Sequence, residues 1–359
     1  MGVWPVGAGG GEEGRVGRPV GAVRSWAPAR LPPMYPRVSD LLYDLFGVES
    51  PIPLYSFGLM VATALVVGAW ITRRELDRKY ALGQVEPVRI KEKDKRGREK
   101  LVAASPSVLV WTMIAISAVA GVVGAKLFNI VDFWDQFAAN PVRYLFSGSG
   151  LTYLGGLLFA TLGVAWYARR RGIRWGPLAD AIAPASMLGY GIGRIGCYLS
   201  GDGDWGVCSD LAAKPSWIPG PLWSETFPNN FLGVDVLTWG GGERGVETCT
   251  LPPGVADGVY PTMLYETFMA AVLAGLLWAM RKHPFKAGWL FMVYLVMTGA
   301  ERFLIEFIRI NREWAFGLSQ SQWLSIAMMI AGVVGAVVLA RGREPQRPRP
   351  DATPEPAAA

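Results

Sequence analysis

Two arginines and a glutamate lie inside otherwise apolar stretches of the sequence. Arg194 follows a glycine-rich run, and Arg302 precedes Glu306 by four residues. A charged side chain at membrane depth is costly, so such residues mark functional sites by default. Arginine presents a planar fork of donors that suits a phosphate, and glycines beside it would let a ligand approach. The alternatives for Arg194 are snorkelling to the interface or pairing with an acid.

The acids near these arginines indicate what the site could bind. Positions 302 and 306 share one helix face, so Arg302 and Glu306 are expected to pair, either as a structural bridge or beside a polar cavity. Asp202 and Asp204 follow the Arg194 stretch, and we expect these residues to cluster. Glu266 lies near the start of another apolar stretch, where simple helix capping is the alternative. The set suits an anionic amphiphile such as a phospholipid, with no metal or nucleotide motif.

The elements that position these residues are predicted from hydropathy. Hydrophobic residues make up 51% of the 359 residues and charged residues 18%, against roughly 25% in soluble chains. Four charge-free stretches are long enough to cross a membrane as helices: residues 55–72, 101–125, 151–168 and 314–340. Three more apolar stretches contain embedded charges: residues 178–200, 262–280 and 287–308. The sequence therefore predicts an all-α polytopic membrane protein with about seven transmembrane helices.

The basic residues indicate the direction of these helices. Residues 73–100 contain eleven Lys or Arg. The loops that follow residues 151–168 and 262–280 and the C-terminal tail are also basic. The alternate loops contain few, so the positive-inside rule predicts an outer N-terminus and a cytoplasmic C-terminus. The net charge of +6 is then a topology signal. Nucleic-acid binding is the rival interpretation, but no aromatic or glycine-rich RNA-binding motif accompanies the basic loop.

The remaining segments divide the chain. Residues 1–33 contain four arginines on the predicted outer side and no apolar core of a signal peptide, so we expect a non-native or disordered leader. A membrane domain over 34–343 follows, in which the long outer loop 201–260 could form a cap, and 344–359 is expected to be a disordered cytoplasmic tail. Cys208 and Cys249 in that loop form a disulfide or remain two thiols.

Five motifs in these stretches resemble one family. They lie at residues 152–156, 193–206, 260–266, 302–309 and 318–325, and their order resembles that of the prolipoprotein diacylglyceryl transferases. The resemblance implies a bacterial inner-membrane enzyme without a cofactor. Such an enzyme transfers the diacylglyceryl group of phosphatidylglycerol to the lipobox cysteine of a prolipoprotein signal peptide. The products are a thioether and glycerol phosphate.

The resemblance also implies the site residues. The catalytic group is Arg194, Arg302, Glu306 and Asp202. The substrate-binding group is Arg194, Gly155, Gly156, Asp204, Tyr265, Glu266, Gln322 and Arg309. No metal is implied, and nucleic acid is not an expected partner.

The chain departs from the family pattern where a base would be sought. Leu154 and Tyr260 stand where the family often has histidine, and Phe57 and Thr298 stand where tyrosine is common. Cys197, three residues after Arg194, stands where the family has asparagine. Either such a base is not essential, or Glu306, Asp202 or Asp204 replaces it. A catalytically silent lipid- or lipoprotein-binding protein and a small-solute transporter are the alternatives to the enzyme.

Overall fold

The computed structural model describes residues 34–48, 54–93, 97–145, 152–237, 255–311 and 313–343. The α-helices are α1 Val38–Phe46, α2 Ser56–Ala81, α3 Val110–Asp132, α4 Trp134–Ala139, α5 Pro141–Leu145, α6 Tyr153–Arg170, α7 Trp175–Ser200, α8 Thr262–Met280, α9 Trp289–Ile305 and α10 Gln320–Ala340. The strands are β1 Val88–Lys93, β2 Glu99–Ala104, β3 Cys208–Ser209, β4 Gly258–Val259, β5 Glu313–Ala315 and β6 Leu318–Ser319. Short 3-10 helices include η1 Pro106–Leu109, η2 Gly220–Leu222 and η4 Glu306–Ile308. The predicted leader 1–33 and tail 344–359 lie outside the described residues.

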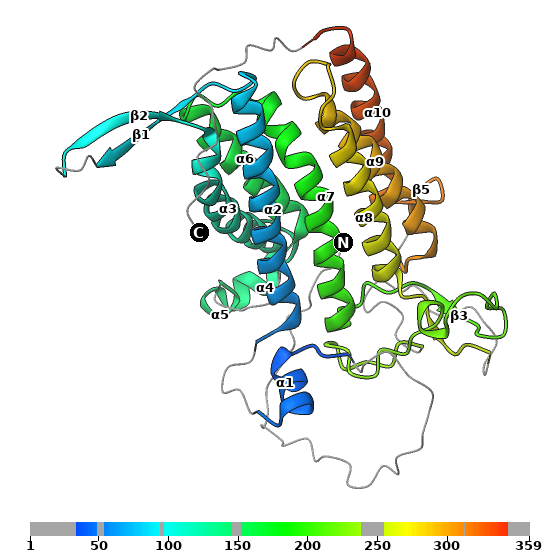
Figure 1. Ribbon diagram of the computed structural model, residues 1–359. Helices are drawn as coiled ribbons and strands as arrows, with labels where there is room; N and C mark the ends of the chain where they lie inside the picture. The colour runs from blue at the N-terminus through cyan, green and yellow to red at the C-terminus, as the bar shows by residue number, and fades with distance from the viewer. Residues whose placement is uncertain are drawn as a thin grey trace.

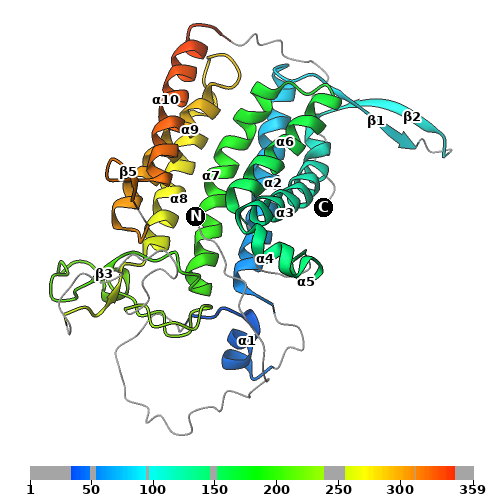
Figure 2. The same ribbon diagram turned by 180° about the vertical axis from the view of Figure 1, so that it is seen from behind.

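The long helices run side by side, with α7 at the centre of the bundle (Figures 1 and 2). Helix α7 packs against α2, α8 and α9, whereas α3 packs mainly on α6 and α10 on α9. Successive long helices alternate in direction. The β1–β2 hairpin and the α8–α9 loop therefore lie at one end of the bundle, and α1, α4, α5 and the segment after α7 lie at the other (Figure 1).

Four helical segments are long and apolar enough to cross a membrane. By length and composition they are Ser56–Ala81, Pro106–Asp132, Thr262–Met280 and Gln320–Ala340. Large apolar side chains on all four are exposed, including Val66, Val122, Phe268 and Val337. Exposed apolar side chains along helices of this length and composition are typical of lipid-facing surfaces. The chain is a mostly helical, polytopic membrane protein.

Three of the predicted stretches differ from the observed helices. Residues 101–104 extend β2 instead of beginning a helix, because Leu101 and Ala103 pair with Lys91 and Arg89 of β1. Residues 314–319 belong largely to the β5–β6 hairpin, whose turn at Gly317 has a φ of +71°. The predicted span 151–168 corresponds to α6, which is not among the four candidates and ends in two arginines. Absence of charge therefore did not by itself mark the helix boundaries.

The segment after α7 folds back over one end of the bundle. Gly201 ends α7 in the left-handed conformation, with φ of +58°, which glycine adopts without strain. Trp205 and Phe227 are fully buried there. They cluster with Val259 of β4 and with Met263 at the start of α8. Cys208 is disulfide-bonded, which supports the bridged alternative for this cysteine, and Cys249 lies outside the described residues. This packed segment supports the residues that follow Arg194.

Helices α3 and α6 approach each other through glycine. A Cβ atom on Gly155 of α6 would overlap the backbone oxygen of Gly124 and the side chain of Phe128, both on α3. Close backbone approach through small residues is a common way for helices to associate in membranes. Gly155 and Gly156 therefore contact α3, and the structure gives them a packing role.

We expect Gly155→Ala to lower the midpoint of thermal unfolding of the detergent-solubilised protein. Overpacking of this kind costs about 1–3 kcal/mol. Gly275→Ala on α8 is the matched control, because nothing lies within 4 Å of a Cβ atom there. The control should be neutral or stabilising by up to about 1 kcal/mol, since alanine favours helix. Equal midpoints for the two variants would contradict the packing role.

Candidate functional site

Ionised side chains from α7, α8 and α9 meet near the end of the bundle that the segment after α7 covers. Arg194 comes from the last turns of α7, Glu266 from the first turns of α8, and Arg302 from the end of α9. Arg309 follows η4, and Asp204 follows α7. We call these five residues, together with Glu306, the arginine cluster. The predicted clustering of Arg194, Arg302 and the acids is thus observed.

Glu266 is the central acceptor of the arginine cluster. Its carboxylate is fully buried and accepts hydrogen bonds from Arg194 Nε at 2.5 Å and Arg302 Nη1 at 3.1 Å. Arg309 Nη1 lies 3.4 Å from the same carboxylate, and the Tyr190 hydroxyl donates to it at 2.9 Å. Glu266 therefore acts as the shared counter-ion of three arginines and not as a simple helix cap.

Asp204 bridges two of the arginines. One carboxylate oxygen accepts from Arg194 Nη1 and the other from Arg309 Nη2 at 2.5 Å. Burial raises the pKa of the Asp204 carboxyl, but the guanidinium groups of Arg309 and Arg194 outweigh burial and hold that pKa well below its usual value. Asp204 is therefore ionised at neutral pH and lies between the guanidinium groups of Arg194 and Arg309.

Glu306 is held by its own set of partners. Arg302 Nη2 lies 3.1 Å from its carboxylate, as the four-residue spacing predicts. Asn311 and the Ser319 hydroxyl donate to Oε1 at 2.8 and 2.7 Å. Ser319 also caps α10 in a capping box with Gln322. Gln322 thus orients Ser319 at the edge of the cluster.

Asp202 lies beside Asp204 and Cys197. Its Oδ1 is buried and has no hydrogen-bond partner among the described residues. Burial, and then the neighbouring Asp204 carboxylate, raise the pKa of Asp202 to about 7. The Cys197 sulfur and carboxylate oxygens of Asp202 and Asp204 lie within 4.8 Å of one another. A carboxyl with a pKa near neutrality is suited to taking up a proton.

These three groups form a possible metal-ligand set, but their partners do not favour a cation. Both carboxylate oxygens of Asp204 face guanidinium groups, and Arg194 Nη1 also lies 3.6 Å from Cys197 Sγ. A metal ion among them would sit directly against positive charge. The electrostatics of the site are better suited to an anion.

An anionic ligand could enter this site by replacing an acid. Arg194 and Arg309 both contact Asp204 and Glu266, and Arg302 contacts Glu266 and Glu306. The Glu266 side chain is 0% exposed, whereas that of Asp204 is 24% exposed. Asp204 is therefore the acid that an entering anion would displace with less rearrangement. Of the two alternatives considered for Arg194, pairing with an acid is observed, and its role in binding phosphate stays a prediction.

Several residues expected at the site lie apart from the arginine cluster. Gly155 and Gly156 pack on α3, as described above. The Tyr265 hydroxyl donates to the Leu222 oxygen at 2.6 Å, so it anchors the segment after α7. Tyr260 packs edge-on against Trp223 in the same segment. Among the described residues, Gly155, Gly156 and Tyr265 make no recorded contact with the arginines, so their predicted roles in substrate binding stay predictions.

The sequence did not point to two further polar residues at the site, the half-buried Tyr190 and the buried Glu301. Tyr190 lies one turn before Arg194 on α7 and bonds Glu266. Glu301 precedes Arg302, is buried, and has an Oε1 atom without a hydrogen-bond partner among the described residues. The four-residue spacing of Tyr190 from Arg194 places both on one helix face and was the available signal.

Comparison with known proteins gives a consistent result. The family model "Prolipoprotein diacylglyceryl transferase" matches residues 44–338. A Dehalococcoides mccartyi protein, named phosphatidylglycerol--prolipoprotein diacylglyceryl transferase, is 31% identical over 231 residues, covering 63% of this chain and 75% of the relative. An Enterococcus faecalis protein of the same name is 26% identical over 87% of this chain and 94% of its own. A Bacillus cereus protein, also of that name, is 26% identical over 80% of this chain and 88% of its own.

Proposed function

The chain belongs to the prolipoprotein diacylglyceryl transferase family, and from this premise we propose how its arginine cluster performs the reaction. The protein is a transferase that moves the diacylglyceryl group of phosphatidylglycerol to a prolipoprotein. The lipobox cysteine of the signal peptide is the proposed acceptor. The observation that supports this assignment best is a group of three guanidinium groups at the end of apolar helices, two of which share the displaceable acid Asp204.

We propose that α2, α3, α6, α7, α8, α9 and α10 all cross the bacterial inner membrane, within a membrane domain over residues 34–343. The basic loops would then be cytoplasmic, with the N-terminus outside and the C-terminus inside. The segment after α7 would cap the outer face. This orientation agrees with the alternation of the helices in Figure 1 and gives the arginine cluster access to the outer leaflet.

The lipid phosphate is proposed to take the place of Asp204 between Arg194 and Arg309. Two guanidinium forks can bind the phosphate oxygens, and Glu266 would keep the arginines oriented from the buried side. Arg302 is the most exposed of the three, with 27% of its side chain accessible, and is available to meet the incoming headgroup. Glu306 would hold Arg302 in position.

The proposed reaction is a displacement at carbon. The cysteine sulfur forms a bond to the glycerol carbon of the diacylglyceryl group, and the bond between that carbon and the phosphate oxygen breaks. The electron pair leaves with the oxygen, so glycerol phosphate departs with one more negative charge. Arg194 and Arg309 would stabilise that developing charge, which is the type of interaction that accelerates a reaction most.

The thiol proton requires an acceptor, because a free cysteine is only slightly ionised at neutral pH. Asp204 is held by two arginines, and Glu306 accepts hydrogen bonds from Asn311 and Ser319 and forms an ion pair with Arg302, so both carboxylates are already engaged. Asp202 has a buried unpaired oxygen and a pKa of about 7. We therefore assign the base to Asp202 among the three acids that the sequence left open.

We expect Asp202→Asn to lower kcat by about 10²–10⁴-fold, the usual contribution of a general base. The wild-type rate should fall as pH drops below about 7, because Asp202 then becomes protonated, and the variant should lose this dependence. Rates across pH 5.5–8.5 with a lipobox peptide test this. Asp40→Asn on the exposed helix α1 removes the same charge and should keep the wild-type profile. An unchanged profile in Asp202→Asn would exclude Asp202 as the base.

A cellular experiment tests the proposed function as a whole. A bacterium depleted of its own transferase should recover growth and lipoprotein lipidation when it expresses this chain. The Arg194→Ala variant, produced at the same level in the membrane, should fail to restore either. Membrane insertion without lipidation by the wild-type chain would instead favour a catalytically silent lipid-binding protein.

A further inference from the structure

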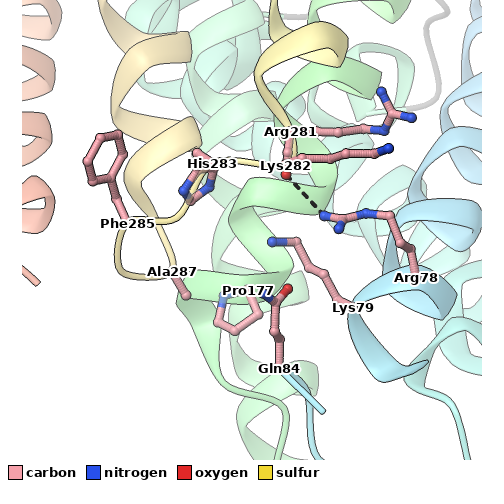
Figure 3. Close-up of a pocket in the computed structure, with 9 residues that line it drawn as sticks. All are labelled: Arg78, Lys79, Gln84, Pro177, Arg281, Lys282, His283, Phe285 and Ala287. Carbon is pink, nitrogen blue, oxygen red and sulfur yellow. Dashed lines mark hydrogen bonds between the residues drawn. The ribbon is translucent and has the colours of Figure 1, made fainter. Parts of the chain in front are cut away.

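A charged pocket lies at the opposite end of the bundle from the arginine cluster. It forms where the end of α2, the start of α7 and the α8–α9 loop meet (Figure 3). The polar residues that line it are Arg78, Lys79, Gln84, Arg281, Lys282 and His283. Figure 3 shows the Lys79 side chain directed toward the loop that bears Lys282 and His283. None of these residues is used by the proposed reaction.

Positive charge in this pocket exceeds the negative charge that the described contacts supply. Two buried acids lie behind the pocket. Glu75 pairs with Arg78 at 2.5 Å and with Arg281 at 3.7 Å. Asp180 lies 3.6 Å from Lys79 and accepts from the backbone N–H groups of Gly288 and Phe291. The pocket therefore holds four permanent cations, with two acids behind them: Arg78, Lys79, Arg281 and Lys282 against Glu75 and Asp180. In the arginine cluster, by contrast, each guanidinium group contacts at least two acids. An anion would complete the charge balance.

Buried polar atoms in the pocket also lack partners among the described residues. Gln84 is buried, with 9% of its surface exposed, and its Oε1 accepts no hydrogen bond from a described residue. The His283 side chain is 6% exposed, and neither ring nitrogen makes a hydrogen bond, although Nε2 lies 3.4 Å from Asp180. A buried acceptor such as Gln84 Oε1 needs a donor. The pocket thus offers cations for an anionic group and an acceptor for a neighbouring hydroxyl.

The pocket lies at the level of the helix ends, where lipid headgroups would lie. Helix α2 ends at Ala81 and α8 at Met280, so the lining residues lie within a turn or two of the ends of two apolar helices. Trp278 supports Arg281, whose guanidinium carbon lies 4.0 Å from the ring centroid. Tryptophan and basic residues at helix ends are typical of the membrane interface, and basic pockets between helices bind anionic headgroups.

We propose that this pocket binds the phosphoglycerol headgroup of an anionic lipid in the adjacent leaflet, separately from the reacting lipid. Lys79, Lys282 and Arg281 would meet the phosphate oxygens, and Gln84 Oε1 would accept from a glycerol hydroxyl. The proposal rests on the apolar helices crossing the membrane and not on the transferase reaction. Free glycerol phosphate has the same chemistry, so the experiment separates the two sources.

Native mass spectrometry of the full chain in a non-ionic detergent tests the proposal, with di-octanoyl phosphatidylglycerol as the probe. We expect Lys282→Glu to retain one lipid fewer than the wild type. Lys282 is exposed, and its side chain forms no hydrogen bond or ion pair with the residues that the structure describes, so the variant should fold. Arg169→Glu, an exposed arginine at the end of α6, is the matched control and should retain the wild-type number. Equal numbers in Lys282→Glu and the wild type would overturn the proposal.

Two further arms identify the ligand. Di-octanoyl phosphatidylcholine should not show the Lys282-dependent binding, and an equal concentration of glycerol 3-phosphate should not displace the lipid. Displacement by glycerol 3-phosphate would overturn the assignment to a lipid. Gln84→Leu should remove any preference for phosphatidylglycerol over phosphatidic acid of the same chain length, whereas a retained preference would overturn the role of Gln84. Transferase turnover, measured on the same samples, distinguishes loss of this pocket from failure of the proposed function.

Discussion

Replacing Arg194 by alanine is expected to reduce diacylglyceryl transfer by at least about 10³-fold. The variant loses the fork that would bind the lipid phosphate and stabilise charge on the leaving group, and one such donor alone contributes about 10²–10³-fold. It also leaves Asp204 and Glu266 without a main partner. Initial rates of peptide lipidation, with phosphatidylglycerol above saturation for the wild type, measure this effect.

Arg194→Lys should recover little of the activity. Lysine keeps the charge but provides a single ammonium group, whereas Arg194 uses Nε, Nη1 and Nη2 to reach two acids at once. Arg169→Ala at the far end of α6 removes an arginine from an exposed position and should leave the rate unchanged. A wild-type rate in Arg194→Ala, with an intact fold, would contradict a phosphate role for this residue.

Replacing Glu266 by glutamine is expected to have the largest effect on stability. Three guanidinium groups and the Tyr190 hydroxyl converge on this fully buried carboxylate. Removing one partner of a buried charge network costs about 3–5 kcal/mol, because the remaining charges stay desolvated without compensation. The midpoint of thermal unfolding in detergent should therefore fall, and transfer should be lost because the arginines are no longer oriented.

Glu99→Gln provides the matched control for this change. Glu99 pairs with Lys91 at 2.7 Å on the β1–β2 hairpin, but their side chains are 56% and 71% exposed. An exposed pair of this kind contributes about 0–1 kcal/mol, so the midpoint should hardly move. If Glu266→Gln were as stable as Glu99→Gln, Glu266 would not be the counter-ion that holds the cluster together.

Local spacing predicted part of the site correctly. Arg302 and Glu306 pair as their separation on one helix face requires, and the polar start of α10 forms a capping box. The contact between Arg309 and Asp204 joins residues 105 positions apart, and Glu266 meets Arg194 over 72 positions. No helical period reports such contacts, because they depend on how α7, α8 and α9 pack. The central position of Glu266 therefore emerged only from the structure.

Hydropathy predicted helices more reliably than their ends. Residues 101–104 are uncharged, yet backbone pairing with β1 keeps them in a strand. The glycine pair of α6 is part of a motif that resembles one of the family's, and in the structure it allows close approach to α3 instead of reaching the arginines. A motif thus indicates membership of a family. Only the packing of each residue shows whether it contacts the arginine cluster or holds two helices together.

The most direct test of the transferase assignment is lipidation of a peptide by the purified chain. The protein is incubated in detergent with phosphatidylglycerol and a peptide that contains one lipobox cysteine, and the products are analysed by mass spectrometry. We predict a mass gain of one diacylglyceryl group, located on the cysteine sulfur as a thioether, with release of glycerol phosphate. A folded protein that binds phosphatidylglycerol but leaves the cysteine unmodified would contradict the account.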